Sequence, residues 1–129
     1  MQDAAEPWWV IGSAAVALHG ADAGPIGDVD VLLAVTDAER LLPRLGLAVA
    51  GGQADERFRS AVFARWTAPP LPVEFMAGLE VKDEVGWTAV HPATRVAVAG
   101  LYLPDRAELV TILRRFGRPK DHARAALLA

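Results

Sequence analysis

Trp9-Val-Ile-Gly-Ser-Ala-Ala-Val-Ala-Leu-His-Gly20 and, after a glycine-rich loop, Gly27-Asp-Val-Asp-Val-Leu-Leu33 are the two segments that decide the fold. The apolar residues before Gly12 predict a short strand. The small residues that follow predict a helix over Ala14 to His19, with Ser13 as its N-cap. The second segment predicts another strand, so the expected order is strand, turn, helix, loop, strand.

Two aspartates, Asp28 and Asp30, open that second strand. Side chains alternate between the faces of a strand, so both carboxylates project from one face, with their α-carbons about 6.5 to 7 Å apart. Carboxylates at this spacing can chelate a hard divalent cation. Val29, Val31, Leu32 and Leu33 would bury the strand itself. The charges then stay at the rim of the sheet, where a metal ion or water satisfies them.

The composition limits the classes of protein that fit. At 129 residues the chain predicts a single domain over residues 1–129. It has no cysteine, which excludes disulfides and thiolate metal sites, so a metal should be bound by oxygen. No apolar run approaches the roughly 20 residues that cross a bilayer, and the N-terminus lacks the basic start of a signal peptide. We therefore expect a cytoplasmic protein without membrane contact, and the many Ala, Gly, Val and Leu residues indicate a GC-rich bacterial source.

The middle of the chain predicts one helix and a hairpin. Thr36-Asp-Ala-Glu39 fits a capping box that opens a helix, which Pro43 should shorten or kink. Gly46 to Gly52 predicts a connection with a short strand. The β-formers in Arg59 to Trp66 predict a strand, and prolines separate it from a second strand over Pro72 to Met76. These two strands should pair as a hairpin with a wide loop.

The last third predicts a β-rich stretch and two helices. Arg95 to Leu103 is apolar and rich in β-formers. Asp105 should cap a helix that Gly117 closes, and a final helix should begin near Pro119. Strands thus alternate irregularly with helices and some neighbours form hairpins, which favours an α+β fold, a mixed β-sheet with helices packed on it.

Glu74 is a charged residue among apolar ones on the second hairpin strand. With Asp28 and Asp30 it would supply three carboxylates, enough to hold two Mg²⁺ ions about 3.5 to 4 Å apart, as in nucleotidyl transfer. It could instead pair with Arg59 or Arg65 across the hairpin. Both interpretations remain open from the residues alone.

Basic residues crowd the C-terminal part of a chain whose formal charge is −3. A patch facing phosphate, for a nucleotide or nucleic acid, is one interpretation, and the solvated face of a terminal helix is the other. The residues concerned are Arg114, Arg115, Arg118, Lys120 and Arg124.

These motifs together resemble the nucleotidyltransferase superfamily. Its members carry Gly-Ser or Gly-Gly at the start of a helix, Asp-x-Asp on the next strand and an acid on a later strand, which correspond here to Gly12-Ser13, Asp28-Val-Asp30 and Glu74. Gly117-Arg-Pro-Lys-Asp121 also resembles the Arg-x-Lys-Asp segment of minimal nucleotidyltransferases and AbiEii-type toxins. The matching segments extend over nearly the whole chain, which looks like a small, single-domain bacterial member.

The resemblance implies a polymerase-β-like nucleotidyltransferase fold and an enzyme that moves a nucleoside monophosphate from a nucleoside triphosphate onto a hydroxyl of a small molecule, protein or RNA. It implies two Mg²⁺ ions held by Asp28, Asp30 and Glu74, which are also the implied catalytic residues. It implies nucleotide-binding roles for Gly12, Ser13 and Lys120.

Three departures from the family pattern motivate an alternative from another class. Glu74 stands where Asp is usual, Leu113 stands where many relatives have Lys, and residues 21–27 lack the basic residue that is frequent before Asp-x-Asp. The alternative is a catalytically degenerate module that keeps the fold and binds or regulates a partner, such as one in a toxin–antitoxin system. In either case a protein partner or a homodimer could complete a chain this short.

Overall fold

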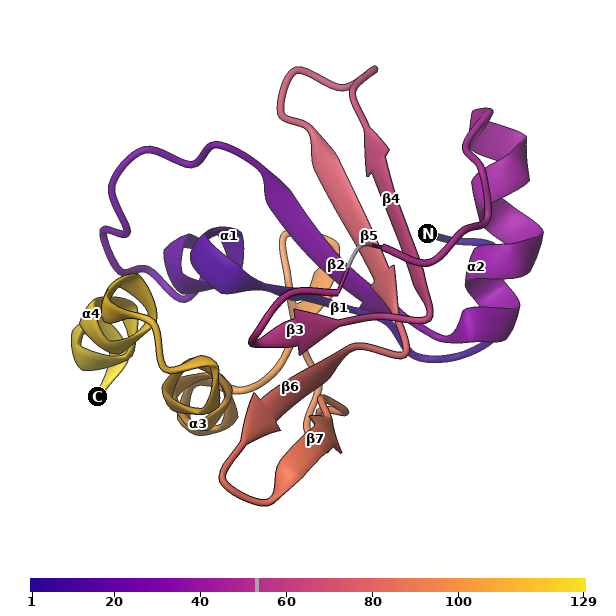
Figure 1. Ribbon diagram of the computed structural model, residues 1–129. Coiled ribbons are helices and arrows are strands. Elements are labelled where there is room, and N and C mark those ends of the chain that lie inside the picture. Colours follow the sequence, from indigo (N-terminus) through magenta and orange to yellow (C-terminus); the bar gives the residue numbers. More distant parts are fainter. Residues whose placement is uncertain (53) are drawn as a thin grey trace.

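A four-stranded mixed sheet lies at the centre of the molecule (Figure 1), with its strands in the order β1-β2-β5-β4. The computed structural model describes residues 1–52 and 54–129. Strand β1 (Trp9–Ile11) is antiparallel to β2 (Val29–Leu33), which runs parallel to β5 (Val73–Ala77). Strand β5 pairs antiparallel with β4 (Val62–Trp66), which confirms the predicted hairpin.

Two smaller sheets flank this centre. One combines β3 (Phe58–Arg59), β6 (Glu80–Asp83) and β7 (Gly86–Ala89), and the other is the hairpin of β8 (Val96–Val98) and β9 (Leu101–Leu103). The β6–β7 hairpin was not predicted. The β-rich stretch near the C-terminus is two short strands, because the chain reverses between β8 and β9 through two residues with positive φ. The predicted strand within residues 46–52 is absent.

The helices stand on two sides of the central sheet. Figure 1 shows α1 (Gly12–Leu18), α3 (Arg106–Phe116) and α4 (Pro119–Leu128) gathered at one side, and α2 (Val35–Leu41) at the other. Helix α2 continues as a 3₁₀ turn, η1 (Leu42–Leu45), as the predicted shortening at proline requires. In the described part of the chain, no helix is long and apolar enough to pass through a membrane.

The ends of α3 and α4 follow the sequence signals. The Asp105 side chain accepts a hydrogen bond from the Glu108 N–H at 2.8 Å, and Gly117 ends α3 with a φ of 72°. Pro119 occupies the first turn of α4, where its missing N–H costs no hydrogen bond.

Two predicted N-caps are wrong. Helix α1 begins at Gly12, whose φ of 69° turns the chain directly from β1 into the helix, so Ser13 lies one residue inside it. Helix α2 begins at Val35 with no side-chain cap, so the predicted capping box does not form. The Asp37 side chain instead accepts the N–H groups of Ala5 and Glu6, at 3.0 and 2.9 Å, and so ties the N-terminal segment to α2.

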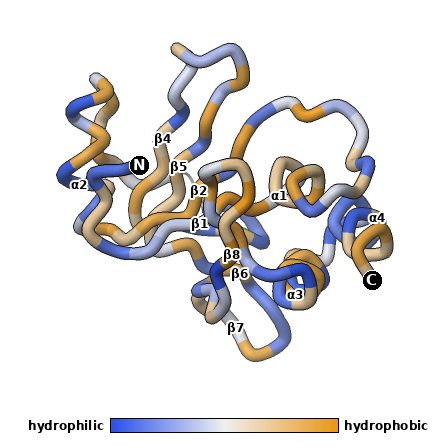
Figure 2. The backbone as a smooth tube through the Cα atoms, turned by 180° about the vertical axis from the view of Figure 1, so that it is seen from behind, coloured by the Kyte–Doolittle hydropathy of each residue, from blue (hydrophilic) through white to orange (hydrophobic). Residues whose placement is uncertain are grey.

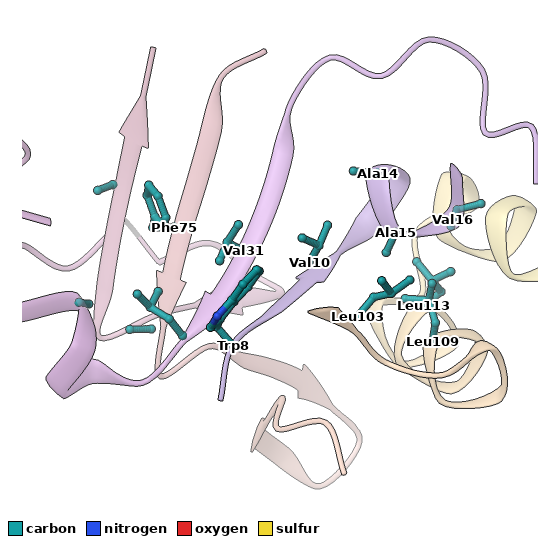
Figure 3. Close-up of a cluster of buried hydrophobic side chains, with 14 of the residues drawn as sticks. Trp8, Val10, Ala14, Ala15, Val16, Val31, Phe75, Leu103, Leu109 and Leu113 are labelled. Atoms are coloured by element: carbon teal, nitrogen blue, oxygen red, sulfur yellow. The ribbon is translucent and has the colours of Figure 1, made fainter. Parts of the chain in front are cut away.

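Both faces of the central sheet are buried over much of their area. Val10 and Val31 lie on one face and belong to the same hydrophobic cluster as Leu109 and Leu113 of α3 (Figure 3). Ile11 belongs to a second cluster on the other face. Alternation along the strands therefore divides the apolar residues between the two layers. In Figure 2 the helices carry both hydrophobic and hydrophilic residues, as expected for helices that pack by one side.

Leu113→Ala should lower the free energy of unfolding by about 2–5 kcal/mol, because the Leu113 side chain is fully buried and its loss leaves a cavity. Urea denaturation measures the change. Leu127→Ala, at a position on the neighbouring helix that is 47% exposed, is the matched control and should change stability by less than about 0.5 kcal/mol. Equal losses in the two variants would contradict the assignment of Leu113 to the core.

Candidate functional site

Asp30 lies in a row of paired residues that crosses the central sheet. It pairs with Ile11 of β1 on one side and with Glu74 of β5 on the other, and Glu74 pairs in turn with Arg65 of β4. Residues directly opposite each other in a sheet place their side chains on the same face. The register therefore brings Asp30, Glu74 and Arg65 together from segments far apart in the sequence.

The three predicted acids meet at one end of this face. Asp28 lies one residue before β2 rather than within it, and the alternation of side chains still carries it to the face of Asp30. One carboxylate oxygen from each of Asp28, Asp30 and Glu74 lies within 4.8 Å of the others. We call this group the carboxylate cluster.

Burial and like charge make the carboxylate cluster electrostatically unfavourable by itself. Burial, with the negative charges of Asp28 and Glu74, raises the pKa of Asp30 to about 7, against the opposing effect of Arg118 and Lys120. Burial and the Asp28 carboxyl also raise the pKa of Glu74, which Arg65 opposes. A bound cation would relieve the repulsion in this cluster.

Arg65 partly supplies that positive charge. Its Nη1 lies 3.4 Å from Glu74 Oε2 and 3.8 Å from Asp28 Oδ2. The hairpin pairing considered for Glu74 is therefore present with Arg65, whereas Arg59 pairs with Glu80 at 2.8 Å. The Arg65 side chain is 47% exposed, so it can leave the carboxylates when another cation arrives.

Gly12 leaves room for the Asp30 carboxylate. A Cβ at position 12 would lie 2.6 Å from Asp30 Oδ2, closer than van der Waals contact permits. The φ of 69° at this residue also favours glycine. With this orientation of the Asp30 side chain, there is no room for a side chain at residue 12.

The other two predicted nucleotide ligands lie near the ends of helices. Ser13 is buried at the second residue of α1, beside Gly12. Lys120 is exposed at the second residue of α4, and its charge acts on Asp30.

Arg118, which the sequence predicted only as a member of the basic C-terminal patch, is a residue of the site. Its Nε and Nη2 donate to the two carboxylate oxygens of Asp121 at 2.6 and 3.0 Å, and its guanidinium lies 4.8 Å from the centre of the Phe58 ring. It also lowers the pKa of Asp30. The signal was the Arg of the segment Gly117–Asp121, from which only the lysine had been assigned a role.

The basic residues near the C-terminus have separate environments. Arg115 donates to Thr88 Oγ1 and to the Ala89 carbonyl, both at 2.9 Å, and so holds β7 against α3. Arg118 is held by Asp121, and Arg114 is exposed. Two members of the predicted phosphate-facing patch, Arg118 and Lys120, lower the pKa of Asp30 by their positive charge.

A cavity of about 460 Å³ lies beside the carboxylate cluster and shares two of its residues, Asp30 and Glu74. The remaining lining residues are Ile11, Gly52, Asp55, Phe58, Arg59, Ser60, Phe63, Met76, Leu79, Phe116 and Arg118. Sequence reasoning did not find this cavity, because its walls come from strands of two sheets and from the corner between α3 and α4.

The oxygen atoms of the carboxylate cluster are suitable ligands for Mg²⁺. Mg²⁺ prefers carboxylate oxygen, and the cluster offers three such ligands in a setting that disfavours their negative charge. The absence of cysteine from the whole chain removes the thiolate ligands that softer metals select.

Comparison with known proteins identifies the fold. No protein-family model matches this chain, and no curated protein matches it. Among solved structures, it is similar to the crystal structure of a "putative nucleotidyltransferase" from Thermotoga maritima, with a TM-score of 0.70 and 19% sequence identity. The similarity covers 92% of this chain and 78% of that one. The α+β nucleotidyltransferase fold is thus confirmed, while the likeness to AbiEii-type toxins stays a prediction.

Gly12→Ala should lower the free energy of unfolding by about 2–4 kcal/mol, since it combines a strained φ with a clash against the Asp30 carboxylate. Gly24→Ala is the matched control, because Gly24 has a φ of 76° and nothing within 4 Å of a Cβ placed there. We expect Gly24→Ala to lower the free energy of unfolding by about 1 kcal/mol, which is the cost of the positive φ alone. Equal losses in urea denaturation would contradict the close fit between Gly12 and Asp30.

Asp30→Asn should stabilise the cation-free protein at pH 8 and do so less at pH 5. The folded-state pKa of about 7 lies above the ordinary value of 3.8, so the contribution of Asp30 to stability is present below pH 4 and is lost as the pH rises through 7. Asparagine removes the buried charge that destabilises the fold above pH 7. Thermal unfolding with a chelator present measures the difference, which should be several degrees.

Asp3→Asn is the control for this measurement, because the Asp3 side chain is 75% exposed. Its unfolding temperature should follow that of the wild type at both pH values. A wild type more stable than Asp30→Asn at pH 8 without cations would show that the Asp30 carboxylate is not electrostatically strained.

Proposed function

We propose that this protein is a Mg²⁺-dependent nucleotidyltransferase that moves a nucleoside monophosphate from a nucleoside triphosphate onto a hydroxyl acceptor. The observation that carries the proposal is the convergence of Asp28, Asp30 and Glu74 on one face of a nucleotidyltransferase fold, beside Gly12. The acceptor hydroxyl belongs to a small molecule, a protein or an RNA. Cytoplasmic location and bacterial source remain predictions.

The carboxylate cluster would hold the metal. Asp28, Asp30 and Glu74 are the proposed ligands of two Mg²⁺ ions and the proposed catalytic residues. When bound, the ions supply positive charge to the attacking oxygen and to the leaving pyrophosphate, which lowers a barrier that is largely electrostatic. The raised pKa of Asp30 supports this role, because a carboxylate that is unfavourable when unpaired gains most from a cation.

The triphosphate would lie at the end of the sheet where β1 passes into α1. Gly12 permits a close approach of the backbone, and Ser13 adds a hydroxyl next to it. Lys120 would contact the phosphates from α4, since it lies close enough for its charge to lower the pKa of Asp30. Arg118, which is held by Asp121 and lines the cavity, adds a positive charge near Asp30 rather than a contact to the phosphates.

A second candidate function is a degenerate module that keeps the fold and binds a partner without transferring nucleotides. Arg65 favours it, because a guanidinium already lies 3.4 Å from Glu74 and 3.8 Å from Asp28, where a metal ion would otherwise balance their charge. Leu113 also favours it, since its side chain is fully buried and no cation stands there to bind phosphate.

Thermal unfolding with ATP, CTP, GTP or UTP, each with and without Mg²⁺, separates the two candidates. A nucleotide at 100 times its dissociation constant should add about 2.7 kcal/mol of stability in the presence of Mg²⁺. Asp30→Asn should abolish the gain, because it removes a metal ligand while leaving the fold intact. Asp3→Asn should retain it. A nucleotide gain that is equal in wild type and Asp30→Asn would refute the metal assignment, and no gain with any nucleotide would favour the degenerate module.

A further inference from the structure

The carboxylate cluster lies between the end of the sheet at which β2 begins, here called the open end, and the cavity of about 460 Å³. Asp30 and Glu74 pair across the sheet, and the next row of side chains on the same face contains Met76 and its partner Phe63. All four residues line the cavity, whereas Asp28, at the open end, does not. We call the pair Asp30 and Glu74 the acidic row. The cavity therefore extends from the acidic row inward along the sheet, away from Asp28.

The proposed triphosphate site lies on the opposite side of the acidic row. Strand β1 is antiparallel to β2, and Ile11 pairs with Asp30. The chain continues from Ile11 into Gly12 and Ser13, so these residues lie toward the open end, where β2 begins. In an in-line displacement at phosphorus the attacking oxygen and the leaving pyrophosphate occupy opposite sides. With pyrophosphate at the open end, the attacking oxygen comes from the cavity.

The size and walls of the cavity indicate a small molecule with a flat apolar body. A volume of about 460 Å³ falls within the range of about 300–1,000 Å³ that is usual for small-molecule sites. Phe63 stands on the sheet side, and Phe58 and Phe116 form an edge-to-face pair with their ring centres 5.1 Å apart on the covering side. Aromatic walls of this kind favour another aromatic ring.

Charged groups of the covering side are already paired within the protein. The Arg118 guanidinium is held by Asp121, and that of Arg59 by Glu80. The Asp55 carboxylate accepts the N–H groups of Arg57 and Phe58 at 2.7 and 2.6 Å. An anionic or cationic ligand would have to compete with these pairs, so the cavity suits an uncharged molecule whose polar group reaches the acidic row.

From this placement we infer that the cavity is the acceptor site and that the acceptor is a small, uncharged aromatic alcohol, an inference that rests on the proposed function. The hydroxyl oxygen forms a bond to the α-phosphorus, the bond from that phosphorus to the bridging oxygen of the β-phosphate breaks, and pyrophosphate leaves. The hydroxyl proton passes to water. The product is a phosphodiester between the nucleoside and the alcohol.

A probe, 4-hydroxybenzyl alcohol, tests the site without knowledge of the natural acceptor. Saturation-transfer NMR should detect its binding to the wild type, with or without nucleotide, because the cavity walls belong to the protein alone. Ser60→Trp places a large side chain in the cavity and should weaken binding at least ten-fold. Thr111→Trp, on the exposed side of α3, is the matched control and should bind as the wild type does. Glucose, a polyol without an aromatic ring, should not bind.

A second variant, Phe63→Leu, tests the cavity even if Ser60→Trp does not fold, because leucine keeps an apolar wall while removing the aromatic ring. It should weaken probe binding several-fold. Both cavity variants should keep the stabilisation by Mg²⁺ and nucleotide that the wild type shows. With nucleoside triphosphate labelled at the α-phosphate, the wild type should transfer label to 4-hydroxybenzyl alcohol and not to glucose.

The outcomes separate this inference from the proposed function. No nucleotide stabilisation of the wild type would overturn the proposed function and, with it, the acceptor role, whatever the probe does. Intact nucleotide stabilisation with no probe binding, or with equal probe binding in wild type and Ser60→Trp, would overturn the inference alone. Loss of nucleotide stabilisation in a folded Ser60→Trp would also overturn it and assign the cavity to the nucleoside of the donor.

Discussion

The close approach of the Asp30 carboxylate to the backbone of Gly12 is the constraint on which the candidate site depends. It places a partly buried acid beside the turn between β1 and α1, where a Cβ would lie 2.6 Å from Asp30 Oδ2. The same acid is surrounded by Asp28 and Glu74, which help to raise its pKa to about 7. Burying like charges this close together destabilises the fold unless a cation offsets them, so stability and cation binding are coupled at one residue.

The surrounding positive charges show how the protein tolerates this arrangement without a metal. Arg65 reaches two of the three carboxylates from the hairpin, and Arg118 and Lys120 act on Asp30 from the corner between α3 and α4. Of these, Arg118 is fixed by Asp121, whereas Arg65 is nearly half exposed. A guanidinium held by a carboxylate keeps its place near Asp30, whereas a solvent-exposed one can move away from the carboxylates when a metal ion binds.

The register of the central sheet organises both the acids and the cavity. One row across the strands is acidic and the next is apolar, and both lie on the face that β3 and the end of α3 cover. A shift of one residue in the pairing of β2 with β5 would move Asp30 and Glu74 to opposite faces. The position of the cavity beside the acids thus follows from pairing rather than from any local motif.

Much of the site could be predicted from the sequence, because alternation and spacing are local properties. The common face of Asp28 and Asp30, the β4–β5 hairpin, the Asp105 cap and the last two helices follow from short segments, whereas Glu74 was joined to the two aspartates by the resemblance to the nucleotidyltransferase superfamily. The sequence left open whether Arg59 or Arg65 pairs with Glu74, and it gave no sign that Asp121 holds Arg118 or that the cavity exists, since each depends on segments that only the fold brings together. The predicted caps at Ser13 and Thr36 failed because both helices begin earlier than the sequence predicted, at Gly12 and Val35. Residue type and spacing determined which groups could carry the chemistry, and the tertiary structure alone decided which of them meet, because burial and charge pairing depend on contacts that no local pattern encodes.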